Sequence, residues 1–283
     1  YMNGWNWVPL DMLYVFERPA KLRHLLMLAQ QANVNLLRVW GGGLIERETF
    51  YNLCDEFGLL VWQEFIQSSS GIDNVPPATP DMIAFMVQEA EQIIPRRRHH
   101  PSLALWCGGN ELQAGPEQPS DDTHPMLAAL RDAVQRLDPD RGWLPTSPSG
   151  RCFSNSLDNI HRDPTALHDV HGPWEHQGLT RQYTLYNAGT SLLHSEFGAE
   201  GITNVRTLRS VMDEANLWPV TLDNRTWMHL GAWWVKERQW RESLGEVADL
   251  ETLVRGTQHL QAEAVRYAIE ANRRRMFQNS GTL

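Results

Sequence analysis

Short apolar runs that end at glycine or at polar residues recur along this chain of 283 residues. Runs of this kind, bounded by residues that break regular structure, are typical of the buried strands of a parallel sheet. The pattern predicts strands at residues 1–7, 36–40, 59–62, 103–107, 143–146, 169–171 and 192–196.

Between these runs, hydrophobic residues recur with the period of an amphipathic helix. We expect Gly58 to stop one such helix and Pro95 to end or kink another. Residues 199–249 have only a weak helical pattern, near 205–212, and a Trp-rich segment around 227–240. The clearer helices are predicted at residues 19–32, 50–57, 80–94, 126–137 and 250–277.

Strands that alternate with helices predict parallel βαβ units. An α/β barrel takes about 250 residues, so one barrel fits this chain. Seven strands, with a last helix that ends where another strand would begin, predict an α/β fold: a (β/α)8 TIM barrel that lacks its eighth strand. The first and seventh strands would then have unpaired edges. A doubly wound open sheet is the alternative, but no Gly-x-Gly-x-x-Gly loop indicates a nucleotide site.

Charge and composition exclude some classes of partner. The chain has 25 basic and 34 acidic residues, a net charge of −9, which argues against a nucleic-acid partner. No run approaches the roughly 18 apolar residues of a membrane span, so no membrane partner is expected. Cys54, Cys107 and Cys152 form no spacing pattern and are expected to be free, partly buried thiols. Twelve Trp outnumber eight Phe and six Tyr, and indole faces stack well on sugars.

The sequence leaves the compartment open. It contains no signal peptide, but it begins with Tyr1 rather than Met, so a signal could lie upstream. The alternatives are the cytoplasm, or the periplasm or cell exterior if such a signal exists.

Two of the predicted strands lead into a glutamate. Two glycines follow residues 103–107 and precede Asn110 and Glu111, and the strand at 192–196 ends on Glu196. Retaining hydrolysis of a glycosidic bond needs two carboxyl groups about 5–5.5 Å apart, and only barrel closure would bring these two together. Either glutamate alone fits a strand-end ion pair equally well, whereas the two together favour catalysis.

Four stretches give the chain its resemblance to a known family: Arg38–Gly43, Val61–Phe65, His99–Glu111 and Ser195–Gly198. The chain resembles the catalytic barrel of glycoside hydrolase family 2, in its β-mannosidase-like branch, across residues 1–283. The resemblance implies a retaining exo-β-glycosidase that acts on an oligosaccharide or glycoside and uses no metal or other cofactor. It also implies covalently linked β-sandwich domains in the full-length protein, which this chain does not contain.

By this resemblance Glu111 is the acid/base and Glu196 the nucleophile. We expect a raised pKa for Glu111, because the acid must hold its proton near neutral pH. Asn110 is expected to bind the 2-hydroxyl of the sugar, with a plain turn residue as the alternative.

Arg38 and Trp40 alternate with Val39, so both point to the same side of their strand. A charged residue inside a barrel needs a carboxylate partner. Glu196 is the candidate, because such pairing keeps a nucleophile ionised, and a structural acid is the alternative. Trp40 resembles the sugar-binding tryptophan of the family, with core packing as the alternative. Glu64 stands where the mannosidase pattern usually has an Asp that binds sugar hydroxyls.

His171 and Trp174 lie near the position where family members have aromatic or histidine contacts, and both are predicted to bind substrate. His194 is expected to be a buried structural residue. The other histidines, including His99 and His100, lack metal-ligand spacing, so no metal site is predicted.

Two departures from the family pattern leave the sugar open. Gly109 and Leu112 flank the Asn110–Glu111 pair where mannosidases commonly have Asn, and the segment between His171 and Glu196 looks longer than usual. A glucosaminide, galactoside or glucuronide is therefore an alternative substrate. A non-catalytic sugar-binding barrel, or a fragment that depends on missing domains, is the alternative from another class.

Overall fold

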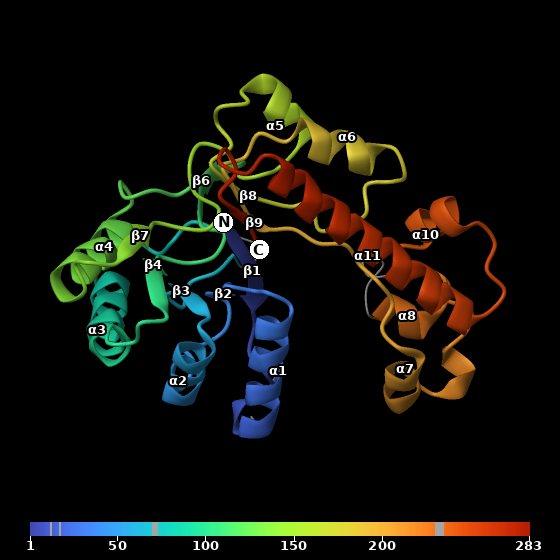
Figure 1. Cartoon of the computed structure of the whole chain (residues 1–283), viewed down its shortest axis with the longest axis horizontal. Helices are drawn as coiled ribbons and strands as arrows, with labels where there is room; N and C mark the ends of the chain where they lie inside the picture. The colour runs from blue at the N-terminus through green and yellow to red at the C-terminus, as the bar shows by residue number, and fades with distance from the viewer. Residues whose placement is uncertain (12, 17, 70–72, 230–234) are drawn as a thin grey trace. The chain divides into compact units, whose positions relative to one another are not determined.

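The computed structural model describes residues 1–11, 13–16, 18–69, 73–229 and 235–283 (Figure 1). The chain forms two compact units. The first unit comprises Tyr1–His171, Thr190–Glu196 and Met276–Leu283, and the second comprises Gly172–Gly189 and Phe197–Arg275.

A parallel sheet of eight strands forms the centre of the first unit, and its strands run in the order β7-β4-β3-β2-β1-β10-β9-β8. All seven predicted strands match within two residues at each end, including the strand predicted at 143–146, which begins one residue earlier and ends at Leu144. The strands are β1 (Met2–Trp7), β2 (Leu36–Val39), β3 (Leu60–Glu64), β4 (Leu103–Cys107), β7 (Gly142–Leu144), β8 (Asp169–His171), β9 (Leu193–Glu196) and β10 (Gly281–Thr282).

The eighth position of the barrel is occupied by only two residues, so a full-length eighth strand is absent, as predicted. The prediction of unpaired edges on the first and seventh strands is wrong. Gly281 and Thr282 pair in parallel with Met2 and Asn3, and Thr282 also pairs with His194. Among the described residues, no ladder joins β7 to β8, so this is where the sheet stays open.

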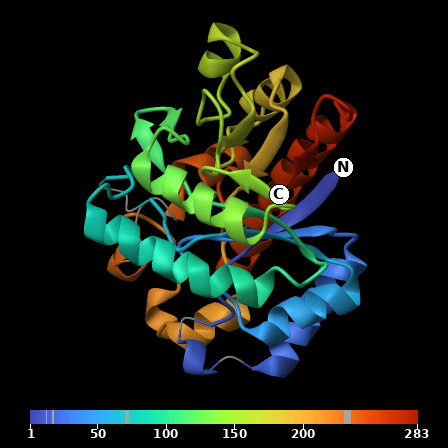
Figure 2. The same cartoon turned by 90° about the vertical axis from the view of Figure 1, so that its left-hand side faces the viewer.

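Helices connect the strands of the first unit (Figure 1). Figure 2 shows α3 and α4 lying side by side on the outside of the sheet. Gly58 ends α2 in the left-handed conformation, with φ 69°, as its position predicted. Pro95 does not end its helix, because α3 continues to Arg97. The helices are α1 (Pro19–Gln31), α2 (Glu48–Phe57), α3 (Pro80–Arg97), α4 (Pro125–Leu137), α5 (Leu157–Arg162) and the 3-10 turn η1 (Tyr14–Phe16).

The sequence pattern did not predict α5 or the short antiparallel pair β5 (Gln113–Gly115) and β6 (Gln118–Pro119). Both elements are too short to show a period, and they lie in segments rich in polar residues.

Side-chain alternation along the strands separates two cores. Leu37, Val39 and Trp106 belong to the large cluster that also includes residues of α1–α4. A smaller cluster on the other face of the strands contains Leu36, Trp62, Cys107, Leu193 and Leu283. Arg38 and Glu64 have the parity of this second group, so the fold directs both charges to the inside of the barrel.

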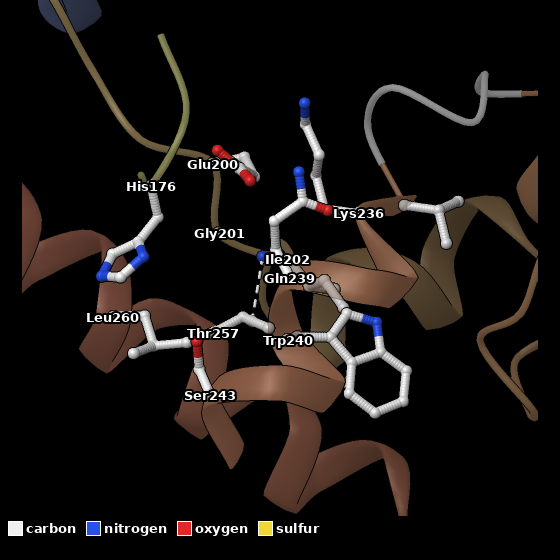
Figure 3. A pocket seen from close by; sticks show the side chains of 11 residues that line it. His176, Glu200, Gly201, Ile202, Lys236, Gln239, Trp240, Ser243, Thr257 and Leu260 are labelled. Atoms are coloured by element: carbon white, nitrogen blue, oxygen red, sulfur yellow. Dashed lines mark hydrogen bonds between the residues drawn. The ribbon is translucent and has the colours of Figure 1, made fainter. Parts of the chain in front are cut away.

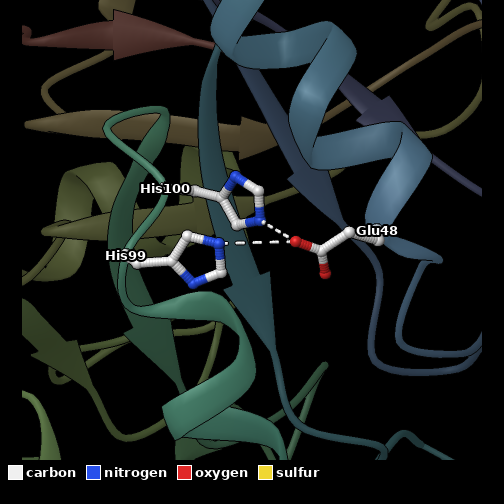
Figure 4. A group of neighbouring side chains, drawn as sticks. All are labelled: Glu48, His99 and His100. Carbon is white, nitrogen blue, oxygen red and sulfur yellow. Dashed lines mark hydrogen bonds and ion pairs between the residues drawn. The ribbon is translucent and has the colours of Figure 1, made fainter.

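His100 connects α2 to the segment before β4. Its Nδ1 lies 2.7 Å from Oδ2 of Asp55, and its Nε2 lies 3.0 Å from Oε1 of Glu48, which His99 also approaches at 3.4 Å (Figure 4). The backbone N–H of Ser102 donates to the same Asp55. These contacts support the structural role expected for the two histidines.

The second unit contains helices only, within the described residues. Its core includes Ile202, Leu217, Trp227, Trp240 and Leu253. Residues 230–234, which belong to the predicted Trp-rich segment, lie outside the described part of the chain. The helices are α6 (Arg181–Ala188), α7 (Val205–Val211), η2 (Glu214–Asn216), α8 (Arg225–His229), α10 (Glu237–Leu244) and α11 (Leu250–Arg274).

Two further expectations concern the whole chain. Cys54, Cys107 and Cys152 are free and buried. Among the described helices, none combines the length and the apolar character that crossing a bilayer requires.

Candidate active site

The loop after β4 carries Asn110 and Glu111. Gly108 and Gly109 precede them, and neither has a positive φ. A Cβ on Gly108 would lie 2.2 Å from the carbonyl oxygen of Pro145, and one on Gly109 would lie 2.7 Å from that of Gln67. The glycines are therefore needed for close approach between neighbouring backbones, and not for a left-handed turn.

The backbone at Glu111 is itself in the left-handed region, with φ 54°. This conformation is uncommon for a residue other than glycine and costs about 1–3 kcal/mol. Two neighbouring segments hold it: the N–H of Glu111 donates to the carbonyl of Ser147 at 2.7 Å, and that of Asn110 donates to Gln67 at 2.9 Å. Strain of this kind clusters at functional sites, so this observation supports a functional role for Glu111.

Glu111 and Glu196 lie together at the carboxyl ends of β4 and β9. One carboxylate oxygen of each lies within 4.8 Å of the other, and both are near Nδ1 of His171. The distances from this nitrogen are 3.0 Å to Oε1 of Glu111 and 3.6 Å to Oε2 of Glu196. The predicted approach of two glutamates from distant parts of the sequence is confirmed.

Glu111 has the environment of a carboxylic acid that keeps its proton. Burial raises its pKa, against the opposing effects of a hydrogen bond from Ser69 and of the charge on Arg38. The hydroxyl of Ser69 donates to Oε2 at 2.8 Å. The raised pKa predicted for this residue is confirmed.

Arg38 is the central cation of the site, and its side chain has no exposed surface. Its guanidinium donates to Glu196 at 3.0 Å, to Glu64 at 2.8 Å, to Asn110 at 2.6 Å and to Asn6 at 2.8 Å. The predicted pairing of Arg38 with Glu196 is confirmed, and Glu64 is a second carboxylate partner. The guanidinium thus bridges the two carboxylates Glu64 and Glu196.

Glu64 is fully enclosed. Its two oxygens accept hydrogen bonds from Nε of Arg38 and from the backbone N–H of Gly41 at 2.7 Å. Burial raises the pKa of Glu64, while Arg38 and the N–H of Gly41 act in the opposite direction. In this conformation Glu64 acts on the site through Arg38, and its direct contact with a sugar stays a prediction.

A buried polar network lies behind the two glutamates. The hydroxyl of Ser147 is 3.0 Å from Nε2 of His171, 3.0 Å from Oδ2 of Asp169 and 2.9 Å from the hydroxyl of Ser195. Burial lowers the pKa of His171 to about 3 and raises that of Asp169 to about 7. The ring of His171 is therefore neutral around pH 7.

The structure joins six of the eight predicted site residues directly: Arg38, Glu64, Asn110, Glu111, His171 and Glu196. The roles predicted for all eight stay predictions.

The other two predicted site residues are Trp40 and Trp174. Trp40 is half-buried, and its ring lies against the backbone of Gly42. Trp174 belongs to the second unit and is 39% exposed. His194 is fully buried, as expected of a structural residue.

Sequence reasoning missed four polar residues of the site: Asn6, Ser69, Ser147 and Asp169. Asn6 has the parity of a residue that faces the inside of β1, and Asp169 is an acid inside a buried strand, so both left a signal in the sequence. Ser69 and Ser147 left none, because single serines in polar loops are common.

A separate hollow lies within the second unit (Figure 3). Among the described residues that line it, Glu200 is the only carboxylate, and the others include His176, Lys236 and Trp240. Burial raises the pKa of Glu200. A lone carboxylate does not provide the acid and nucleophile that glycoside hydrolysis needs, so the pair in the first unit is the candidate site.

A barrel of parallel strands with two carboxylates within 4.8 Å of each other at the carboxyl ends of its strands is typical of one class of protein, the α/β-barrel glycoside hydrolases. A family model described as "Glycosyl hydrolases family 2, TIM barrel domain" matches residues 18–202. The chain belongs to this family, glycosyl hydrolase family 2.

Several proteins that are similar to this chain are named mannosidases. Beta-mannosidase B of Emericella nidulans is 30% identical over 300 residues, which cover 97% of this chain and 34% of that protein. Beta-mannosidase B of Aspergillus niger has the same identity and coverage. A beta-D-mannosidase from Dictyoglomus thermophilum has a crystal structure that matches the whole chain with a TM-score of 0.82, at 28% identity and 34% coverage of that protein.

The exo-chitosanase CsxA of Amycolatopsis orientalis shares the fold, with a TM-score of 0.73 and 17% identity. The match covers the whole of this chain and 33% of that protein. The chain thus spans about a third of the length of these relatives (34% for the mannosidases).

Proposed function

We propose that this chain is the catalytic barrel of a retaining exo-β-glycosidase that hydrolyses terminal β-mannosides. The observation that carries the mechanism is the approach of Glu111 and Glu196 within 4.8 Å. An inverting enzyme leaves room for a water between its carboxyl groups, about 6.5–9.5 Å apart, so this spacing supports retention. The names of the relatives support mannose as the sugar.

In the first step, a carboxylate oxygen of Glu196 attacks the anomeric carbon, and the bond to the glycosidic oxygen breaks. Glu111 gives its proton to the departing oxygen, so the aglycone leaves as a neutral alcohol. Arg38 pairs with the nucleophile Glu196 at 3.0 Å, and burial raises the pKa of Glu111, which favours the proton that the acid must give.

In the second step, Glu111 takes a proton from water, and the hydroxide oxygen bonds to the anomeric carbon. The bond to Glu196 breaks, which restores both carboxyl groups and releases the sugar with its original configuration.

Asn110 is suited to hold the 2-hydroxyl of the sugar. Its Oδ1 accepts from Arg38, and its Nδ2 donates one hydrogen to Ser68 at 3.1 Å. The second hydrogen of Nδ2 is then available for a substrate hydroxyl. We assign further sugar contacts to Trp40, Trp174 and His171 by resemblance, and we propose that β-sandwich domains flank this barrel in the complete gene product.

The test compares aryl β-mannoside, β-glucoside, β-galactoside, β-glucuronide and β-glucosaminide as substrates of the complete gene product. We expect the mannoside to be turned over fastest, with retention of configuration by proton NMR. Glu111→Gln should reduce kcat/KM by about 10²–10⁴-fold, most strongly for poor leaving groups that need the acid. Glu196→Gln should abolish trapping of a 2-fluoroglycosyl adduct, which peptide mass spectrometry would otherwise locate on Glu196.

Glu56→Gln is the matched control, because Glu56 is an exposed carboxylate that pairs with Arg23 on the surface. Turnover that is the same in the parent and in both site variants would contradict the proposal. Preference for another sugar, with both glutamates still essential, would change the substrate and keep the mechanism. Tight binding of a mannoside-like inhibitor without turnover would instead indicate a sugar-binding barrel.

A further inference from the structure

A chain of hydrogen bonds runs from Asp169 through Ser147 and His171 to Glu111. The distances are 3.0 Å from Oδ2 of Asp169 to the hydroxyl of Ser147, 3.0 Å from this hydroxyl to Nε2 of His171, and 3.0 Å from Nδ1 to Oε1 of Glu111. Asp169 is 4% exposed, and Ser147 and His171 are fully buried. The hydrogen bonds of Ser147 and His171 in the middle of this series are therefore made between buried protein groups.

The directions of these three hydrogen bonds depend on one another. The neutral ring of His171 carries one hydrogen, and the hydroxyl of Ser147 carries one. When the ring hydrogen is on Nδ1, the ring donates to Glu111 and Nε2 accepts from Ser147. Ser147 then has no hydrogen left for Asp169, so the 3.0 Å contact between them is a hydrogen bond only if Asp169 holds a proton and donates it to Ser147.

The other tautomer reverses every bond. With the ring hydrogen on Nε2, Glu111 donates its proton to Nδ1, the ring donates to Ser147, and Ser147 donates to Asp169. Three short proton shifts connect the two arrangements: Glu111 to Nδ1, Nε2 to Ser147, and Ser147 to Asp169. No atom is gained or lost, and one carboxyl proton moves between the two ends.

We propose that Asp169 is a positioning residue that controls the protonation of Glu111 through the tautomer of His171. The two carboxyl groups share one proton, so Glu111 is an acid when Asp169 is ionised and a base when Asp169 is protonated. This matches the two roles that retaining hydrolysis asks of one residue. The inference rests on the proposed function of Glu111 as acid/base.

The two ends of this series have similar surroundings. Burial raises the pKa of both carboxyl groups, and the charge on Arg38 acts against this at both. At the Glu111 end, Ser69 donates to the carboxylate, and Glu196 also faces the ring.

At the other end, the hydroxyl of Ser195 lies 2.9 Å from that of Ser147. Ser195 hydrogen bonding also opposes the raised pKa of Asp169. Among the described residues, Oδ1 of Asp169 has no hydrogen-bond partner, which disfavours full ionisation at this end.

Asp169→Asn tests the coupling, because the amide can donate to Ser147 but cannot take up a proton. The variant should fix the ring hydrogen on Nδ1 and favour ionised Glu111. We expect the basic limb of the kcat/KM profile to move to lower pH by about one unit. In a protein that already carries Ser147→Ala, Asp169→Asn should not move this limb further, because the hydrogen bonds that link Asp169 to His171 are already lost.

Ser102→Ala is the matched control for loss of a buried serine hydroxyl. Ser102 is buried and does not belong to the series of hydrogen bonds from Asp169 to Glu111. It should leave the pH profile unchanged. An active Asp169→Asn enzyme whose basic limb of the kcat/KM profile is unchanged would overturn the proposal. So would a shift of this limb that is equally large with Ser147 and with Ser147→Ala.

Nitrogen-15 NMR of the His171 ring provides a readout that does not depend on turnover. The parent should contain both tautomers around pH 7, and Asp169→Asn should contain only the Nδ1–H form. Identical tautomer populations in the two proteins would also overturn the proposal. Absence of hydrolysis in the parent, with the expected tautomer change, would contradict the proposed function and leave the coupling intact.

Discussion

Replacing Asp169 with asparagine should change how the stability of the protein depends on pH. The pKa of Asp169 is about 7 in the folded protein, against 3.8 for an ordinary aspartate. Between these values the folded protein holds a proton that the unfolded chain has lost. The corresponding stability is fully present below pH 3.8 and is lost as the pH rises through 7.

The slope of this effect is about 1.4 kcal/mol per pH unit for one proton. Between pH 4.5 and 6.5 the parent should therefore lose about 2–3 kcal/mol through Asp169. Asparagine does not titrate, so the unfolding free energy of the variant should rise relative to the parent by this amount over the same range.

His171 has the opposite effect on the pH dependence of stability, both in the parent and in the Asp169→Asn variant. Its pKa falls from 6.5 to about 3 on folding, so the unfolded chain binds the extra proton and stability increases with pH between these values. In the parent the two slopes nearly cancel between pH 4.5 and 6.5. In the variant the slope of His171 is no longer offset by that of Asp169.

Urea unfolding at pH 4.5, 5.5 and 6.5, followed by circular dichroism, measures the difference between variant and parent. Asp81→Asn is the control: Asp81 is exposed and its pKa is lowered below 3.8, so it titrates below this pH range and its removal should leave the slope between pH 4.5 and 6.5 nearly unchanged. Parallel pH profiles for Asp169→Asn and the parent would refute the reasoning, because they would mean that folding does not place a proton on Asp169.

Three further substitutions test the architecture, each by urea unfolding. Arg38→Met should lower the free energy of unfolding by about 3–5 kcal/mol, because it leaves Glu64 buried without its cation. Adding Glu64→Met to this variant should restore most of the lost stability. Equal stability of the single and the double variant would contradict the pairing. Gly108→Ala should cost about 1–3 kcal/mol or more, because the new Cβ would lie 2.2 Å from the carbonyl of Pro145, and a neutral result would show that this approach is not tight. Asp249→Ala should cost about 1 kcal/mol, because it removes the side-chain cap of α11, while Asp249→Ser should retain most of the stability.

Most strands and the long helices were predictable from local pattern. Buried parallel strands are short apolar runs, and amphipathic helices keep one apolar face, so each element leaves its own signal in the sequence. The eighth strand left no such signal, because Gly281 and Thr282 become a strand only by pairing with Met2 and His194, which lie far away in the sequence. The helix through Pro95 is a similar case, since packing in the first unit outweighs the local cost of a proline inside α3.

The sequence by itself determined which residues have the chemistry of the site: two glutamates at strand ends, an arginine inside the barrel, and an amide beside the acid. Only the tertiary structure decided that Glu111 and Glu196 meet at one nitrogen of His171, and that Arg38 joins Glu64, Glu196 and Asn110. It alone revealed the connection through Ser147 to Asp169. The reason is physical: residue type sets what a side chain can donate or accept, whereas burial and distance, which depend on strands far apart in the chain, set its pKa and its partner.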